Sequence, residues 1–88
     1  MNVKIDLAFE KDIKTLKNAK TLRQISYTIE GIRKATNIGA IKGIKKLKGY
    51  KNYYRIRIGD YRAGLIIDGK TVSLICFIHR KDIYKRFP

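Results

Sequence analysis

The sequence predicts a small single domain of the α+β class that spans residues 1–88. In chain order we expect a strand, two helices and three strands, with the helix hairpin packed on a twisted antiparallel sheet and a short C-terminal tail or helical turn. Two observations predict this class: apolar residues recur at helical spacing in the first half of the chain and alternate in the second half. The hydrophobic share of 44% is typical of a globular core, and a chain this short favours one domain.

The chain begins with the pattern of a short strand and a helix. Val3, Ile5 and Leu7 lie two positions apart, which is typical of a half-buried strand. The next apolar residues follow at spacings of four and three, as on one face of a helix: Phe9, Ile13 and Leu16.

A second helix is expected to begin near Thr21. The sequence from Thr21 to Gln24 matches a capping box, in which the threonine hydroxyl and the glutamine side chain bind free backbone N–H groups. Apolar residues then recur at spacings of three, four and three: Leu22, Ile25, Ile29 and Ile32. Asn37 and Gly39 are typical of a helix end. We expect the apolar stripes of both helices to lie in the core, with the binding of a partner as the alternative.

The second half of the chain predicts a loop and a three-stranded meander. Residues 40–51 are rich in glycine and lysine and are expected to form a loop with a few buried anchors. Strands are expected over three ranges, joined by turns at Gly59-Asp60 and Asp68-Gly69: Tyr53–Ile58, Tyr61–Ile67 and Thr71–His79. The closing stretch, Arg80–Pro88, predicts a helical turn or a tail.

Alternation along these strands predicts two faces of opposite character. One face is nearly all apolar and is expected to pack under the helices. The other face carries Arg55, Arg57 and Arg62, with Arg57 directly opposite Arg62. Because like charges opposite each other destabilise a sheet, we expect an anion between them. The same alternation places His79, the only histidine, on this face and leaves open space at Gly64.

The chain is strongly basic, with 21 Lys+Arg against 7 Asp+Glu and a net charge of +14. Such a charge attracts polyanions and accelerates association with them. Nucleic acid is the first partner to consider, followed by an acidic protein and an anionic membrane surface. A solubilising surface of lysines is the alternative, although arginines on a strand face fit it poorly.

The composition excludes several classes of protein. The single cysteine, Cys76, cannot form an intramolecular disulfide and is expected to be buried. No apolar run approaches the roughly 18 residues of a membrane span. The lack of a signal peptide and of a disulfide framework indicates a cytoplasmic protein. One histidine and scattered carboxylates do not form a zinc or magnesium site, so we expect no metal and no small-molecule cofactor.

The residues expected on the arginine-bearing face suit phosphate chemistry. Guanidinium groups bind phosphate and stabilise charge that develops in a transition state, and histidine can carry a proton near neutral pH. Several aromatic side chains are candidates to stack on an unpaired base: Tyr53, Tyr61, Phe77, Tyr84 and Phe87. Lysines of the loop can grip a phosphate backbone, or remain solvated without a specific role: Lys45, Lys46, Lys48 and Lys51.

The sequence from Tyr53 to Arg62, YYRIRIGDYR, is followed by an Asp-Gly hairpin and by HRKDIY at residues 79–84. This combination resembles the RelE/ParE superfamily of toxins from type II toxin–antitoxin pairs. The order of a strand, two helices, a loop and a meander matches that family over nearly the full length. The resemblance implies a small α+β domain with two helices against a twisted antiparallel sheet.

The resemblance implies one of two activities. RelE-like members cleave messenger RNA, usually in the ribosomal A site, by attack of the 2′-hydroxyl on the adjacent phosphate, whereas ParE-like members inhibit DNA gyrase. Basic positions and a late tyrosine of the RelE pattern fall on Arg55, Arg57, Arg62, Arg80 and Tyr84. Their retention favours a metal-independent mRNA endoribonuclease, an mRNA interferase.

The resemblance also implies a role for each residue. Arg57 and Arg62 hold the scissile phosphate and its developing charge, and Arg80 shares the stabilisation of that charge. Arg55 orients the neighbouring backbone. From their own charge and aromatic character, we expect the four loop lysines and Tyr53 to bind RNA. Relatives often carry lysine where this chain has strand arginines, and arginine is a poor base. His79 is therefore expected to be the general base for the 2′-hydroxyl or the acid for the leaving 5′-oxygen, while Tyr84 stacks on a base or supplies a proton.

Two alternatives to the nuclease stay open, a ParE-like gyrase inhibitor and a non-catalytic basic nucleic-acid-binding homologue. For a toxin, the expected partner is a cognate antitoxin with an acidic binding segment, because a charge of +14 invites complementarity. For the nuclease, the further partners are messenger RNA and the ribosomal A site. We expect the antitoxin to wrap the domain and to cover or displace the segment around Tyr84.

Overall fold

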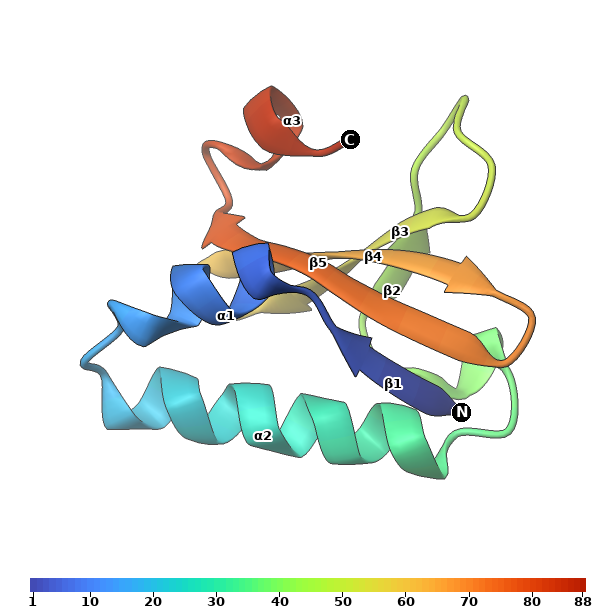
Figure 1. Ribbon diagram of the computed structural model, residues 1–88, viewed down its shortest axis with the longest axis horizontal. Coiled ribbons are helices and arrows are strands. Elements are labelled where there is room, and N and C mark those ends of the chain that lie inside the picture. Colours follow the sequence, from blue (N-terminus) through green and yellow to red (C-terminus); the bar gives the residue numbers. More distant parts are fainter.

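The computed structural model describes residues 1–88, in which a five-stranded sheet carries two helices on one face and a short helix on the other (Figure 1). The elements in chain order are β1 (Asn2–Ile5), α1 (Leu7–Lys14), α2 (Ala19–Lys34), a 3-10 turn (Ile38–Ala40), β2 (Ile44–Lys46), β3 (Tyr53–Ile58), β4 (Tyr61–Asp68), β5 (Thr71–His79) and α3 (Ile83–Arg86). The predicted α+β class with a helix hairpin on the sheet is confirmed. None of the helices combines the length and apolar character needed to cross a membrane.

The strands are ordered β1-β5-β4-β3-β2, and two features of this sheet differ from the expectation. β1 runs parallel to β5, with Val3 opposite Val72, so the sheet is mixed rather than antiparallel. The stretch expected to be a loop contains β2, which pairs antiparallel with β3 and sets Lys45 opposite Arg55. The alternation of apolar and polar residues does not predict β2, because this strand has only three residues and two of them are lysines. Such a composition is typical of a protected sheet edge.

The first turn of α2 is capped by an asparagine. The side-chain oxygen of Asn18 accepts hydrogen bonds from the backbone N–H groups of Lys20 and Thr21, at 2.9 and 3.2 Å. The predicted capping box at Thr21 is therefore wrong, since asparagine is among the strongest N-cap residues and starts the helix earlier. The first strand also ends before Leu7, which begins α1 and is 71% exposed.

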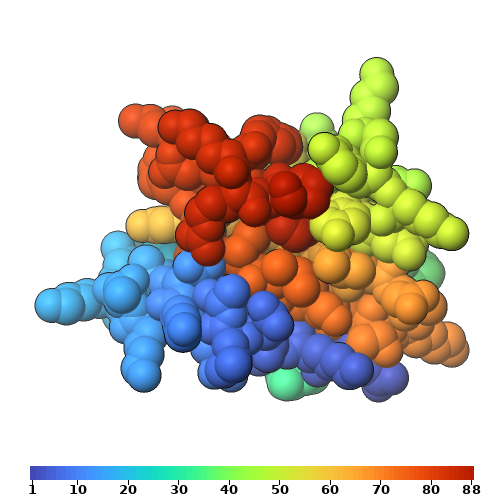
Figure 2. All heavy atoms as spheres, turned by 45° about the horizontal axis from the view of Figure 1, so that its top comes forward, coloured from blue at the N-terminus to red at the C-terminus, as the bar shows by residue number.

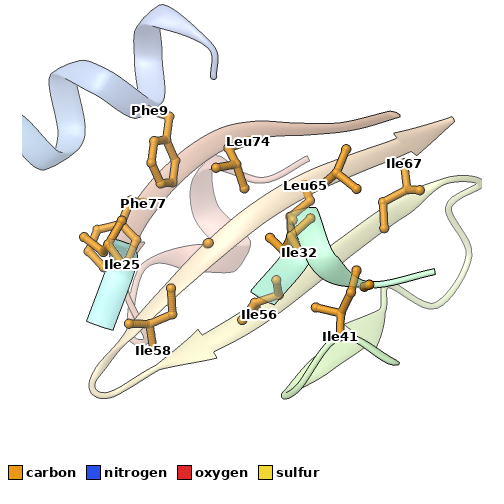
Figure 3. Close-up of a cluster of buried hydrophobic side chains, with 13 residues drawn as sticks. Phe9, Ile25, Ile32, Ile41, Ile56, Ile58, Leu65, Ile67, Leu74 and Phe77 are labelled. Carbon is orange, nitrogen blue, oxygen red and sulfur yellow. The ribbon is translucent and has the colours of Figure 1, made fainter. Parts of the chain in front are cut away.

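α1 and α2 cover a core of 13 buried residues on one side of the sheet, which we call the helix face (Figure 3). Ile32 of α2 is fully buried together with Ile56 of β3 and Leu65 of β4. Phe9 of α1 meets Phe77 of β5 edge-on, with 5.9 Å between the ring centroids. The expectation that the helical stripes lie in the core is confirmed, apart from Leu22, which is 38% exposed.

A second, smaller cluster on the opposite face fixes the C-terminal segment, residues 80–88. Figure 2 shows this segment lying between the N-terminal part of the chain and the turn from β2 to β3. Its anchors Ile83 and Phe87 are 2% and 3% exposed, and they pack with three other buried side chains: Leu47, Cys76 and Ile78. The burial expected of Cys76 is confirmed, and this burial raises the pKa of its thiol.

Both hairpin turns of the meander begin with a glycine in the left-handed region, with φ of 59° and 58°. The turn between β3 and β4 is Gly59-Asp60, as predicted. The next turn is Gly69-Lys70 rather than Asp68-Gly69, because Asp68 pairs with Thr71. A glycine at the first central position is typical of a type II′ hairpin.

Candidate functional site

Four arginines come together on the face of the sheet opposite the helices, and we name them the arginine cluster: Arg55, Arg57, Arg62 and Arg80. The pairing of β3 with β4 sets Arg57 directly opposite Arg62, as predicted. Arg80 follows β5, and its backbone N–H donates to the carbonyl of Asp60 at 2.9 Å, beside the turn between β3 and β4. Two adjacent strands and the end of a third therefore supply the cluster.

The arginine cluster has no carboxylate partner within the chain. The three ion pairs of the protein all involve other cations: Arg33 with Glu30, Lys85 with Asp82, and Arg86 with Asp12. The acidic side chains are also dispersed, so no group of three or more His, Cys, Asp or Glu residues could hold a metal ion. The positive charge of the cluster is thus left for an anion from outside the chain.

Arg62 lies at the centre of this electrostatic field. Its Nη1 atom donates hydrogen bonds to the carbonyls of Gly59 and Tyr61, at 3.1 and 2.9 Å, which fixes the guanidinium above the turn. Burial lowers the pKa of Arg62, and the positive charges of the other three cluster members lower it further, while Tyr84 acts in the opposite direction. Because arginine keeps its proton in proteins, the repulsion is relieved by binding an anion rather than by losing charge.

A cleft of about 420 Å³ extends from the arginine cluster toward β2. Arg55 and Tyr84 line it together with three of the predicted RNA-binding lysines: Lys45, Lys46 and Lys48. Tyr84 is 68% exposed, so its ring and hydroxyl are accessible from solvent. Lys51 lies outside the cleft, on the exposed turn between β2 and β3.

Most of the aromatic side chains proposed for base stacking are engaged within the protein. Phe77 and Phe87 are each 3% exposed and belong to the two hydrophobic clusters. Tyr61 stacks on Phe77 with 5.0 Å between the ring centroids, and Tyr53 leans on Phe87 at 5.4 Å. Tyr84 alone of the five is largely exposed.

β5 contains a bulge that alternation along the sequence could not predict. Leu65 pairs with Leu74 and Gly64 pairs with Cys76, so Ile75 has no partner on β4. One extra residue sends every later side chain of the strand to the opposite face. The bulge explains why Phe77 packs in the core under α1.

The predicted placement of His79 beside the arginines is wrong, and the bulge is the reason. His79 pairs with Tyr61 on the helix face, with 5.6 Å between the ring centroids. Its Nδ1 atom accepts a hydrogen bond from the backbone N–H of Lys81 at 3.2 Å. The expected proton carrier therefore lies on the other side of the sheet from the arginine cluster, while Arg80, the next residue, joins the cluster.

The open space predicted at Gly64 is filled by the C-terminal segment. A Cβ atom added at Gly64 would lie 2.8 Å from Cγ of Phe87 and 2.8 Å from Sγ of Cys76. Glycine is required here because another side chain approaches its backbone closely. Gly64 thus leaves room for the ring of Phe87 to pack on the sheet next to the arginine cluster.

Sequence reasoning missed a second basic hollow, between α2 and the end of β3. A hollow of about 440 Å³ is lined by Tyr27, Lys42 and Arg57, among others. An adjoining hollow of about 380 Å³ adds Lys20 and Arg23. The available signal was the set of basic residues that lie off the apolar stripe of α2.

Comparison with known proteins places this fold in a family. A family model described as the ParE toxin of the type II toxin–antitoxin system parDE matches residues 3–84. The chain belongs to the RelE/ParE toxin family. The toxin is 39% identical over 89 residues to Toxin RelE3 of Methanocaldococcus jannaschii, with 100% of both chains covered.

Solved structures of related toxins have the same fold. The RelB-RelE antitoxin–toxin complex from Methanococcus jannaschii gives a TM-score of 0.81 at 36% identity, covering 97% of this chain and 99% of that chain. The archaeal RelE-RelB complex from Pyrococcus horikoshii OT3 gives 0.73 at 22% identity, covering 90% and 93%. The YoeB dimer from Staphylococcus aureus gives 0.70 at 21% identity, covering 91% and 97%. This protein is thus a RelE-like toxin of a toxin–antitoxin system.

Proposed function

We propose that this toxin is an mRNA endoribonuclease that acts on the ribosome. The observation that carries the proposal is the arginine cluster, whose four guanidinium groups have no carboxylate partner and whose member Arg55 lines a lysine-rich cleft. RNA is a polyanion, and arginine recognises its phosphates through paired hydrogen bonds. The 39% identity to a protein named Toxin RelE3 supports the RelE branch of the family.

The proposed reaction is an intramolecular transfer within the RNA. The 2′-oxygen attacks the adjacent phosphorus, the bond from phosphorus to the 5′-oxygen breaks, and the products are a 2′,3′-cyclic phosphate and a 5′-hydroxyl. The 2′-hydroxyl loses a proton and the leaving 5′-oxygen gains one, so protons and charge balance. In the proposal, Arg57 and Arg62 bind the phosphate oxygens from opposite strands, and Arg80 shares the negative charge of the transition state. Arg55 and Lys45, paired across β3 and β2, bind the neighbouring phosphate.

Tyr84 is the side chain to which we assign contact with the substrate near the reacting oxygens. It is exposed, lines the cleft with Arg55, and lies close enough to Arg62 to influence the pKa of that guanidinium. A phenol in this place can donate a proton to the leaving oxygen or stack on a base. Because His79 lies on the helix face, we assign it no role in proton transfer.

A translation reaction with a defined messenger tests the proposal. The wild-type toxin should cut the messenger at mapped positions, and Arg62→Gln should lower the rate by about 10²–10³-fold, the usual effect of removing one group that stabilises the transition state. Arg33→Gln is the matched control, because it removes the same charge from an exposed ion pair on α2. Equal cleavage by Arg62→Gln and Arg33→Gln would contradict the proposed site, and no cleavage by the wild type, with or without ribosomes, would contradict the function.

A second candidate is inhibition of DNA gyrase, favoured by the ParE description of the matching family model. A supercoiling assay with purified gyrase separates the two candidates. Inhibition of supercoiling by a toxin that leaves messenger RNA intact would establish the second candidate and reject the first.

We also propose that an acidic antitoxin neutralises this toxin. The complexes from Methanococcus jannaschii and Pyrococcus horikoshii join a RelE toxin to a RelB antitoxin, and the charge of +14 on this chain favours an acidic partner. Co-expression with the product of the neighbouring gene should be needed for yield. A high yield of active toxin expressed alone would count against this partner.

A further inference from the structure

Asp12 of α1 joins three parts of the chain that are far apart in sequence. Its Oδ2 atom accepts a hydrogen bond from the backbone N–H of Phe77 at 2.9 Å. Both of its carboxylate oxygens lie 3.1 Å from Nη2 of Arg86 in α3. The other two ion pairs link residues only three positions apart, so Asp12 and Arg86 form the single ion pair between distant elements.

The shape of the sheet explains why a carboxylate is needed at this place. β1 covers the edge of β5 only as far as Leu74. Phe77 lies beyond that point and directs its N–H toward α1, where no strand supplies a carbonyl. A buried N–H without an acceptor is costly, and Asp12, whose side chain is 15% exposed, provides the acceptor. The same carboxylate keeps a second oxygen for Arg86.

The C-terminal segment depends on contacts with the rest of the chain for its position. α3 has four residues, too few for a stable isolated helix. Its anchors Ile83 and Phe87 are buried, but hydrophobic contacts have no direction and leave the rotation of the segment open. Arg86 lies between the two anchors and supplies the directional contact to Asp12, around the end of the sheet where α1 and α3 both lie (Figure 1).

We propose that Asp12 is a positioning residue that holds the C-terminal segment, through Arg86, so that Tyr84 stands over the arginine cluster. Tyr84 lies between the two anchors, so rotation of the segment moves its ring away from Arg62 and from the cleft. Arg80 precedes the anchors and is held by its own backbone hydrogen bond to Asp60. The catalytic consequence rests on the nuclease function proposed above, whereas the tether itself is a property of the free protein.

The experiment compares Arg86→Gln with Arg33→Gln, which removes the same charge from an exposed ion pair of 2.7 Å on α2. Amide hydrogen exchange of the RNA-free protein is measured first, at Lys85 and Phe87, whose N–H groups bond to Asp82 and Ile83. Arg86→Gln should accelerate exchange at both amides by about tenfold, the loss expected for one hydrogen bond to a charged group. Arg33→Gln should leave both rates unchanged.

Asp12 itself is tested with two variants of different severity. Asp12→Asn keeps an oxygen for Phe77 but loses the ion pair, so it should match Arg86→Gln. Asp12→Ala should in addition accelerate exchange at the Phe77 amide. If Asp12→Ala does not fold, the comparison of Asp12→Asn with Arg86→Gln still shows whether the ion pair holds the C-terminal segment.

RNA cleavage then separates positioning from general stability. Arg86→Gln and Asp12→Asn should lower kcat by about tenfold with an unchanged KM, and Arg86→Lys should restore part of kcat, because its ammonium can still reach the carboxylate. Equal exchange rates and equal kcat in Arg86→Gln and Arg33→Gln would overturn the proposal. A wild-type toxin that cuts no RNA would refute the nuclease function, and the exchange rates would still decide whether Asp12 holds the segment.

Discussion

Replacing Gly64 by alanine tests whether the C-terminal segment packs directly on this glycine, beside the arginine cluster. The added Cβ would lie 2.8 Å from Cγ and 2.9 Å from Cδ1 of Phe87. Carbon atoms in contact normally lie about 3.5–4.0 Å apart, so the ring must retreat by roughly 0.7 Å or leave its site. Because Phe87 is 3% exposed and packed on all sides, we expect it to leave.

The size of the effect follows from what Phe87 loses. Re-exposing a buried phenylalanine costs about 1.5–3 kcal/mol, and overpacking a tight core costs about 1–3 kcal/mol. We therefore expect Gly64→Ala to lower the free energy of unfolding by about 2 kcal/mol, which corresponds to a Tm lower by about 8–16 °C for a domain of this size.

Thermal unfolding followed by circular dichroism measures this shift, and Gly31→Ala is the control. Gly31 lies in α2 with no atom within 4 Å of an added Cβ. Alanine in that helix should stabilise the protein by about 0.5–1 kcal/mol, so the same substitution should have opposite signs at the two sites. A Tm for Gly64→Ala equal to or above that of the wild type would refute the close approach of Phe87 to this glycine.

Three further predictions follow from the corrected features of the fold. His79→Ala should leave RNA cleavage within about threefold of the wild type, because its ring lies on the helix face away from the arginines; a loss like that of removing a general base, about 10²–10⁴-fold, would contradict this placement. Asn18→Ala should lower the free energy of unfolding by about 1 kcal/mol in urea titrations, whereas Thr21→Ala should have little effect. A larger loss of stability in Thr21→Ala than in Asn18→Ala would show that Thr21 caps the helix. Burial raises the pKa of the Cys76 thiol, so the folded chain keeps a proton that the unfolded chain loses above about pH 8.5. The free energy of unfolding should therefore fall as the pH rises through that range, and this part of the fall should be absent in Cys76→Ala, while an identical pH dependence in both proteins would exclude the thiol as its cause.

The centre of the site could be predicted from the sequence because it depends on local rules. A two-residue turn at Gly59-Asp60 fixes the register of its two strands, and that register alone sets Arg57 opposite Arg62. The apolar stripes of the two helices likewise follow from residue spacing. These predictions are confirmed because no distant part of the chain can change them.

The bulge at Ile75 shows where alternation stops being informative. Nothing in the residues of β5 marks the extra position, yet it moves His79 to the opposite face. The bulge is specified by packing, because Phe77 after it enters the core against Phe9 while Cys76 joins the second cluster. A strand with apolar residues on both faces satisfies either register until its partners are known.

Contacts between distant parts of the chain account for the remaining differences. The sequence gives no sign of the role of Asp12, because its partners Phe77 and Arg86 lie 65 and 74 residues away. Gly64 was interpreted as open space for the same reason, because Phe87 reaches it from the end of the chain. Sequence spacing carries no information about such pairs, although each is simple once the topology is known.

The chemistry of the RNA ends tests the central claim most directly. A short messenger bound to ribosomes is cut by the toxin, and the termini of both fragments are identified by mass spectrometry. The proposed reaction predicts a 2′,3′-cyclic phosphate on one fragment and a 5′-hydroxyl on the other, and no cut at a position where the 2′-hydroxyl is replaced by hydrogen. A 5′-phosphate, or continued cutting at the 2′-deoxy position, would contradict attack by the 2′-oxygen on a phosphate held in the arginine cluster.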